Sequence, residues 1–86
     1  MITTDSIMML LADKAVISRS TESACELIGE VDPDMAALFL SRPFHRQSIV
    51  SALFASLVDA GFESAYRVRV ALNLVIDSTP LAGEPL

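Results

Sequence analysis

The sequence has almost none of the residues that crosslink a chain or bind a transition metal. Its 86 residues include 1 cysteine, Cys25, and 1 histidine, His45. A lone cysteine cannot close an internal disulfide, and a structural zinc site needs about four Cys or His ligands. The composition therefore excludes a disulfide scaffold and a zinc module.

Basic residues and glycines are also few. Lys and Arg number 6 against 11 Asp and Glu, which gives a formal net charge of −5 at pH 7. Proteins that bind phosphate backbones through charge carry the opposite sign, so the composition argues against nucleic acid as a partner. Because there are only 3 glycines, the sequence has no glycine-rich phosphate loop, and we expect no cofactor.

Long apolar runs are missing as well. The longest strongly apolar runs, residues 7–12 and 35–40, have 6 residues each, whereas a membrane-spanning helix needs about 20. Asp5 stands where a signal peptide would begin with basic residues. We therefore expect no membrane association and a cytoplasmic location.

Apolar side chains are abundant, at 52% of the residues, while charged residues make up 20%. This balance excludes a disordered chain, and the length allows one domain. We predict a single helical domain over residues 1–79 and a loose tail over residues 80–86, where no periodic pattern continues. A folded chain this short buries only about 60% of its unfolded surface, so a homodimer is expected to add burial.

Capping residues divide the first half of the chain into three predicted helices, with the alternative that the third continues the second through a kink at Pro33. A short polar side chain before an apolar periodic stretch satisfies free amides at a helix start. Such residues occur three times, at Thr3 or Thr4 with Asp5, at Ser20 or Thr21, and at Asp32 followed by Pro33. The first helix should end between residues 16 and 19, and the Arg42-Pro43 pair should end the third, because proline disfavours helix before it.

The clearest helical pattern covers residues 45–60, where apolar side chains fill about half of the circumference. Gly61 stands where a helix leaves through a left-handed residue. Phe62 can fold back onto the last turn, as a Schellman ending requires. The sequence therefore predicts a well-defined helix end at this glycine.

Residues 64–77 allow two interpretations. Apolar residues alternate from Tyr66 to Ile76, which is typical of a strand, yet the same residues also form a wide apolar helical face. A lone strand would need another chain to satisfy its backbone, whereas a helix capped by Glu63-Ser64 satisfies its own. We therefore predict an all-α fold ending in an antiparallel helical hairpin of about 45–60 and 64–77.

The apolar faces of this hairpin are wider than one hairpin can hide, so we expect them to contact a second copy or a protein partner. Val70 and Leu74 add a second apolar flank, on the side away from the first. The predicted partner-binding residues are those of the first faces: Ile49, Val50, Leu53, Phe54, Leu57, Val68, Leu72 and Val75.

Arg42, His45 and Arg46 form the one positive cluster in this acidic chain, at the start of the strongest predicted helix. Free amides and the helix dipole also favour negative charge there, so the cluster is a candidate contact for an anion or a partner carboxylate. The alternative is a surface cluster that balances the acidic stripe of Glu22, Glu26 and Glu30 on the second helix.

No constellation of side chains suits catalysis. A nucleophilic cysteine needs an adjacent base, but the neighbours of Cys25 are Ala24 and Glu26. We expect Cys25 to act as a small apolar residue and the glutamate stripe to be a solvated helix face. We therefore predict that the protein is not an enzyme, with no catalytic, cofactor-binding or metal-binding residue.

Residues 46–57 (RQSIVSALFASL) and 65–76 (AYRVRVALNLVI) together resemble the helical hairpin of the YmgB/AriR/YcgZ family of small bacterial regulators. The resemblance implies an all-helical homodimer without enzymatic activity that connects to two-component signalling and biofilm programmes. It transfers no site residue. The Asp32-Pro33 break and the apolar N-terminal segment depart from the family pattern.

The leading functional hypothesis is a non-enzymatic regulatory or adaptor protein that acts by protein–protein interaction through a dimeric helical hairpin. One alternative is a small DNA-associated transcriptional modulator, which requires the basic residues to converge on one face: Arg42, His45, Arg46, Arg67 and Arg69. A second alternative is an accessory or inhibitor protein of a mobile element.

Overall fold

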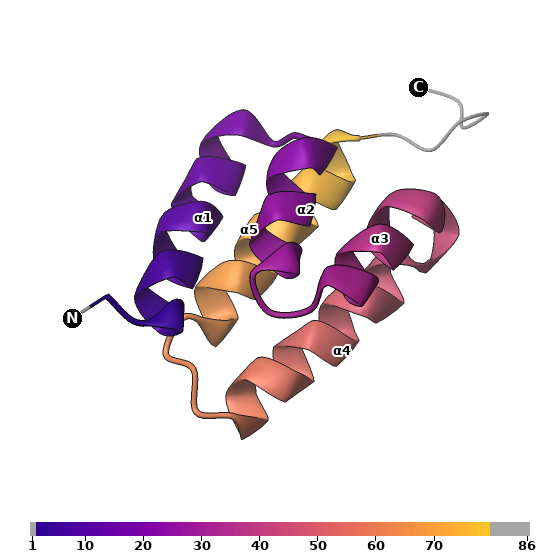
Figure 1. Ribbon diagram of the computed structural model, residues 1–86. Helices are drawn as coiled ribbons and strands as arrows, with labels where there is room; N and C mark the ends of the chain where they lie inside the picture. Colours follow the sequence, from indigo (N-terminus) through magenta and orange to yellow (C-terminus); the bar gives the residue numbers. More distant parts are fainter. Residues whose placement is uncertain (1, 80–86) are drawn as a thin grey trace.

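The computed structural model describes residues 2–79, which form an all-α fold, as predicted (Figure 1). The elements follow one another along the chain as α1 (Thr4–Ser18), α2 (Thr21–Gly29), α3 (Pro33–Ser41), a 3-10 turn (Pro43–His45), α4 (Arg46–Asp59) and α5 (Ala65–Ser78). The tail predicted over residues 80–86 lies outside the described residues.

The first three helices begin at capping residues that the sequence predicts. Thr3, Ser20 and Asp32 each accept hydrogen bonds from backbone amides two or three positions on, at 3.1 to 3.2 Å. Pro33 occupies the first position of α3, where its missing amide has no partner to lose. These local bonds set where each helix starts, because each satisfies amides that the helix itself leaves free.

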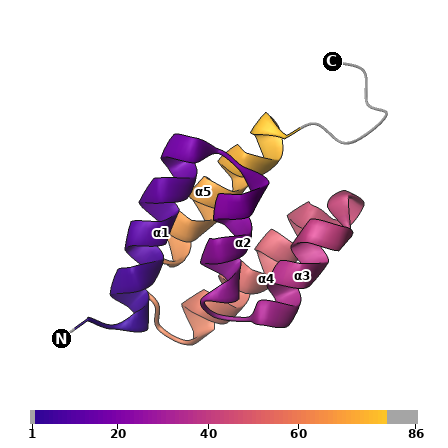
Figure 2. The ribbon, with the colours of Figure 1, turned by 45° about the horizontal axis from the view of Figure 1, so that its top comes forward.

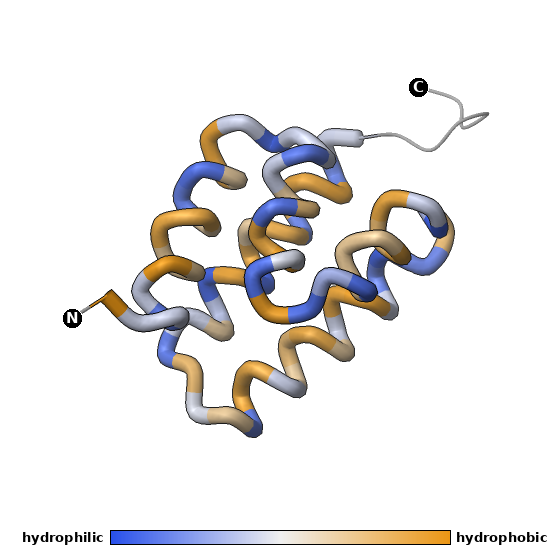
Figure 3. Tube along the Cα trace, viewed as in Figure 1, coloured by the Kyte–Doolittle hydropathy of each residue, from blue (hydrophilic) through white to orange (hydrophobic). Residues whose placement is uncertain are grey.

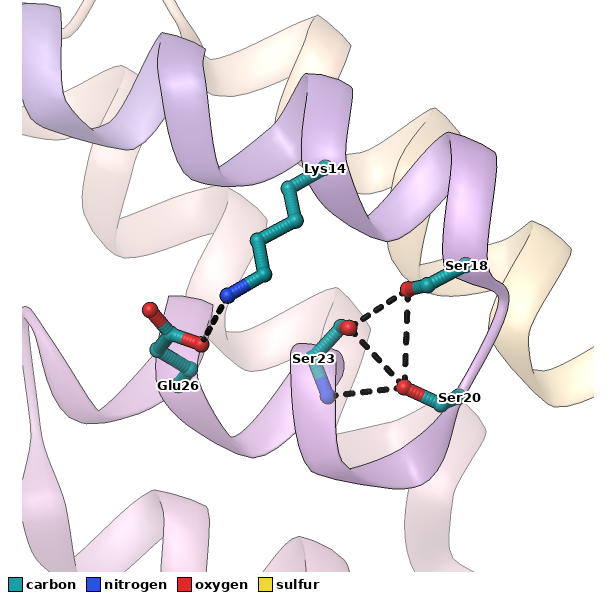
Figure 4. Close-up of polar contacts among 5 residues, drawn as sticks. All are labelled: Lys14, Ser18, Ser20, Ser23 and Glu26. Atoms are coloured by element: carbon teal, nitrogen blue, oxygen red, sulfur yellow. Dashed lines mark hydrogen bonds and ion pairs between the residues drawn. The ribbon is translucent and has the colours of Figure 1, made fainter.

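A tight turn joins α1 to α2. Arg19 adopts a left-handed conformation, with φ of 51° and ψ of 30°, and its amide donates to the carbonyl of Ala15 at 2.8 Å. This reversal lets α2 return alongside α1. Three serine hydroxyls close the turn by hydrogen bonding to one another, namely those of Ser18, Ser20 and Ser23 (Figure 4).

The hairpin of α4 and α5 turns at Gly61, as the sequence predicts. Gly61 has a φ of 80°. The amide of Phe62 donates to the carbonyl of Leu57 at 2.9 Å, and the amide of Gly61 donates to that of Val58 at 3.1 Å. This bond pair is a Schellman motif. The two helices then run side by side in opposite directions (Figures 1 and 2).

One apolar core lies around the inner side of α5. Helices α1 and α4 flank α5, α2 packs against both α1 and α5, and α3 packs on α2. Apolar and polar segments alternate along the helices in Figure 3, so each helix can turn one side inward. The inner side of α5 is at most 1% exposed and consists of Ala65, Val68, Ala71, Leu72 and Val75.

A carboxylate of α1 caps the start of α5. Asp5 accepts hydrogen bonds from the amides of Glu63 and Ser64, at 2.8 and 2.9 Å. Ser64, which the sequence predicts as a cap, stands at the cap position but its side chain makes no capping bond. A residue 59 positions away in the sequence therefore performs the task expected of a local one.

The pKa of Asp5 is lowered by this arrangement. The Ser64 hydroxyl beside the carboxylate has the largest effect, followed by the Glu63 amide, while partial burial opposes them. The Ser64 Oγ atom is itself buried, and it forms no hydrogen bond with another group among residues 2–79. The two amides therefore hold the carboxylate in place, and the nearby hydroxyl favours its charged form.

We predict that Asp5→Asn lowers stability at neutral pH but not in acid. A carboxyl group whose pKa falls on folding stabilises the fold above its unfolded-state pKa, about 3.9. That contribution is lost as pH falls through the lower folded-state value. Urea unfolding should give the variant a lower free energy of unfolding than wild type at pH 7, and the difference should shrink below about pH 4.

The control variant Asp59→Asn removes an exposed carboxylate at the end of α4. An equal fall in the free energy of unfolding of the control would contradict the prediction.

We predict opposite effects for alanine at two glycines. Gly61→Ala forces a side chain into the left-handed region and should lower the free energy of unfolding by about 1 kcal/mol. Gly29 lies in α2 and its added Cβ would sit 3.7 Å from that of Ala36, which is ordinary contact. Gly29→Ala should therefore raise stability by about 0.5 kcal/mol. Chemical denaturation of both variants gives the comparison, and a stabilised Gly61→Ala would refute the helix ending described above.

Candidate functional site

The eight predicted partner-binding residues belong to the core. Seven of them are at most 9% exposed within a single chain, and Phe54 is partly buried against the same cluster. The seven are Ile49, Val50, Leu53, Leu57, Val68, Leu72 and Val75. The structure corrects the prediction for a physical reason: α1 and α2 pack on α5, and α3 packs on α4, so one chain supplies the cover that was expected from a second.

Surfaces for a partner must therefore be sought among the apolar residues that remain exposed. Ten large apolar side chains in the described part of the chain are 37% to 85% exposed: Ile2, Leu10, Ile17, Val31, Leu38, Leu40, Phe44, Val58, Tyr66 and Val70. Scattered exposed apolar residues are normal, whereas neighbouring ones with organised charge mark interaction sites. Five of the ten lie in three surface regions that differ in charge: Leu10, Leu38, Val58, Tyr66 and Val70.

The first region is the outer side of α4 and α5, here called the hairpin face, made of Phe54, Val58, Tyr66, Arg69 and Val70. Its two rings meet edge to face with centroids 5.0 Å apart. The Arg69 guanidinium carbon lies 4.3 Å from the centroid of the Phe54 ring and 5.4 Å from that of the Tyr66 ring. These contacts order the aromatic side chains before any partner arrives. Asp77 continues the outward side of α5, two turns after Val70, so the face carries both signs of charge.

The second region is a pocket of about 270 Å³ between the end of α3 and the start of α4, here called the α3–α4 hollow. It is lined by Leu38, Arg42, His45 and Ile49. Leu38 comes from α3, Arg42 directly follows that helix, His45 ends the 3-10 turn, and Ile49 comes from the first turn of α4. The first turn of α4 has no side-chain cap, so its free amides add positive potential. The hollow is thus apolar and basic.

Arg46, the third member of the predicted positive cluster, is separated from the other two. Its Nε donates to the carbonyl of Phe39 at 2.7 Å, and its guanidinium carbon lies 4.9 Å from the centroid of that ring. Its Nη2 donates to the carbonyl of Leu40 at 3.5 Å. Arg46 therefore satisfies the free carbonyls at the end of α3, while Arg42 and His45 line the hollow.

The third region is acidic. A surface pocket of about 670 Å³ beside α1 is lined by Thr3, Asp5, Ser6, Met9, Leu10, Asp13 and Glu63. Leu10 is 68% exposed there. Arg67 of α5 donates to the Asp13 carboxylate at 2.7 Å, which forms an ion pair between the two helices. The three carboxylates give this region a negative charge.

The predicted acidic stripe is a solvated face. Glu22 and Glu26 on α2 and Glu30 directly after it are all exposed. Glu26 forms a 3.0 Å ion pair with Lys14 of α1, which links the two helices (Figure 4). Exposed ion pairs of this kind contribute at most about 1 kcal/mol to stability. The stripe is therefore a solvated surface of the helix with one weak link to α1.

Cys25 is half-buried between α2 and α3. Its thiol donates to the carbonyl of Ala36 at 3.7 Å. Burial raises the pKa of the Cys25 thiol, while the positive charge of Arg46 partly opposes the effect. A raised pKa leaves less of the reactive thiolate at neutral pH, so this environment favours a packing role.

Comparison with known proteins finds no matching family model, no matching curated protein and no matching solved structure. Residues 2–79 bring together no group of three His, Cys, Asp or Glu side chains that could hold a metal ion. None of the helices among these residues combines the length and the apolar character needed to span a bilayer. The three surface regions are therefore the features of this chain that can indicate its function.

Sequence reasoning missed Leu38 as a site residue and Phe44 as the exposed residue directly before His45. Leu38 lines the α3–α4 hollow, and Phe44 is 77% exposed. The available signal was the Arg42-Pro43 break. A break between two helices places apolar residues one turn before it and one turn after it at the same end of the molecule.

We predict that the two arginines of the positive cluster differ in their effect on stability. Arg46→Ala removes two hydrogen bonds to the end of α3 and should lower the free energy of unfolding by about 1 to 2 kcal/mol. Arg42→Ala removes an exposed side chain and should change it by less than about 0.5 kcal/mol. Urea denaturation of each variant makes the comparison; equal losses would show that Arg42 is also structural.

Proposed function

We propose that this chain is a non-enzymatic regulatory or adaptor protein that acts by protein–protein interaction and forms a homodimer through the hairpin face. The observation that carries the proposal is the exposure of ordered apolar side chains on that face. Tyr66 is 64% exposed, Val70 53% and Val58 48%. Burial of such side chains is the main driving force of association, and preordered rings lose little freedom on binding.

Charge selects the hairpin face for self-association. The chain carries a net charge of −5, so two copies repel each other over most of their surface. In a two-fold interface the same patch meets itself. The acidic region beside α1 and the basic α3–α4 hollow would each place like charges together. The hairpin face carries Arg69 and Asp77, and these can pair across a two-fold axis.

The regulatory part of the proposal takes support from the resemblance of residues 46–57 and 65–76 to the YmgB/AriR/YcgZ family. On that basis we propose a cytoplasmic role in two-component signalling or biofilm formation. The DNA-associated alternative receives no comparable support. Arg46, Arg67 and Arg69 are each held by contacts within the chain, so the basic residues do not gather on one face.

Analytical ultracentrifugation tests the dimer. Wild type should sediment with twice the chain mass, and Val70→Glu should raise the dissociation constant at least about tenfold because it buries an unpaired charge. Val31→Glu is the matched control, since Val31 is 37% exposed in the turn between α2 and α3, outside the hairpin. Circular dichroism should show that both variants remain helical.

A wild-type chain that stays monomeric at high micromolar concentration would overturn the proposed dimer. An equal effect of Val70→Glu and Val31→Glu would overturn the assignment to the hairpin face. The charge argument has its own check. Asp77→Arg should weaken the dimer by placing two arginines together, and the double variant Asp77→Arg with Arg69→Glu should restore part of the loss.

A further inference from the structure

We propose that the α3–α4 hollow is a second binding site that takes an acidic, apolar segment of a partner protein, one large apolar side chain flanked by Asp or Glu. The inference rests on the proposed function in assuming that the protein acts by binding other proteins. It concerns a different surface from the hairpin face and a different occupant, so the two can be tested separately.

The size of the hollow limits what it can hold. Its volume of about 270 Å³ lies below the range of about 300 to 1,000 Å³ typical of cofactor and drug-sized pockets. One leucine or phenylalanine side chain fits such a space. Ile49 is 9% exposed and forms the inner part of the hollow, while Leu38 is 48% exposed at its side. An apolar side chain inserted there would cover both.

An exposed aromatic residue directly precedes His45 in the chain. Phe44 belongs to the 3-10 turn that joins α3 to α4 and is 77% exposed. Exposed aromatic residues of this kind are enriched at protein–protein interfaces, where they contribute much of the affinity. Its exposure adds apolar surface to the turn that supplies His45 to the hollow.

Charge complementarity identifies the flanking residues of the partner. Within residues 2–79 neither the Arg42 guanidinium nor the His45 ring forms an ion pair or a hydrogen bond. Arg46 differs from both, because its guanidinium already donates to a carbonyl at the end of α3. Arg42 and His45 therefore keep donors for a partner. Two donors at the edge of an apolar pocket favour carboxylates beside the inserted side chain.

Other occupants fit less well. A second hollow from another copy would bring Arg42 and His45 against the same residues, which repel. Nucleic acid would meet two basic residues in a chain of net charge −5. Head-to-tail contact with the acidic region beside α1 of another copy satisfies the charges but does not close, and so it would produce growing assemblies instead of a dimer.

A titration of the full chain with a short synthetic peptide tests the site. The peptide carries a Leu-Phe pair flanked by glutamates, and two matched peptides replace either the glutamates by lysines or the Leu-Phe pair by serines. Amide chemical shifts of residues 38, 42, 45 and 49 should change with the first peptide alone. Raising the salt concentration should weaken its binding, because exposed charges are screened.

Arg42→Glu should lower the affinity for the acidic peptide at least about tenfold. Arg19→Glu makes the same change of charge at the α1–α2 turn and should leave the affinity within about twofold. Leu38→Ser should weaken binding without changing the salt dependence. All three positions are exposed, so the variants should fold.

Several results would overturn the site. They are equal binding of the lysine peptide, shifts mapping to another surface, equal losses from Arg42→Glu and Arg19→Glu, or wild-type masses that grow beyond the dimer. The Val70→Glu variant separates the two proposals. If it loses the dimer yet binds the peptide, both stand; if wild type dimerises but no peptide binds, the hollow alone fails.

Discussion

The structure depends on covering the inner side of α5 from three directions at once. α1, α2 and α4 all pack on this helix, and its five inward residues are at most 1% exposed. Two of these, Ala65 and Ala71, are small, as are Ala12 and Ala15 on the buried side of α1. Small residues let helix backbones approach closely, which keeps the core free of gaps. Asp5 aligns α1 with α5, because its carboxylate binds the amides at the start of α5. The burial of α5 therefore depends on the position of α1.

This constraint decides which residues are left for function. Because other helices of the same chain cover the interior of the hairpin, its apolar residues stabilise the fold and cannot contact a partner. Recognition therefore depends on the side chains that stay exposed. The outside is sorted by charge: acidic beside α1, basic at the α3–α4 hollow, and mixed on the hairpin face. In a chain of net charge −5, these differences matter more than apolar area alone, since like charges oppose contact between copies.

The sequence predicts the local parts of this fold well. The caps at Thr3, Ser20 and Asp32 and the helix ending at Gly61 depend on bonds between residues at most five positions apart, so the residue types suffice to find them. The helical state of residues 65–78 follows from the same ending. The prediction fails where bonds join distant segments. Asp5 caps α5 in place of Ser64, and Arg46 bonds α3 instead of facing solvent with Arg42. The hairpin residues expected at a partner surface are buried under other helices of the same chain. No local sequence pattern shows where those helices pack, so the sequence alone could not predict this burial.

The two proposed surfaces use different sides of α4, and this has a functional consequence. Ile49 of the α3–α4 hollow and Val58 of the hairpin face are nine positions apart in α4. At about 100° per residue, this spacing places them on opposite sides of the helix. A dimer formed through the hairpin face would leave both hollows open, so one dimer could hold two acidic segments. Binding the first segment of a two-segment partner raises the local concentration of the second, which gives tight overall binding from two weak contacts. Each hollow can therefore be small and still serve an adaptor, provided that the pairing of the two chains is intact.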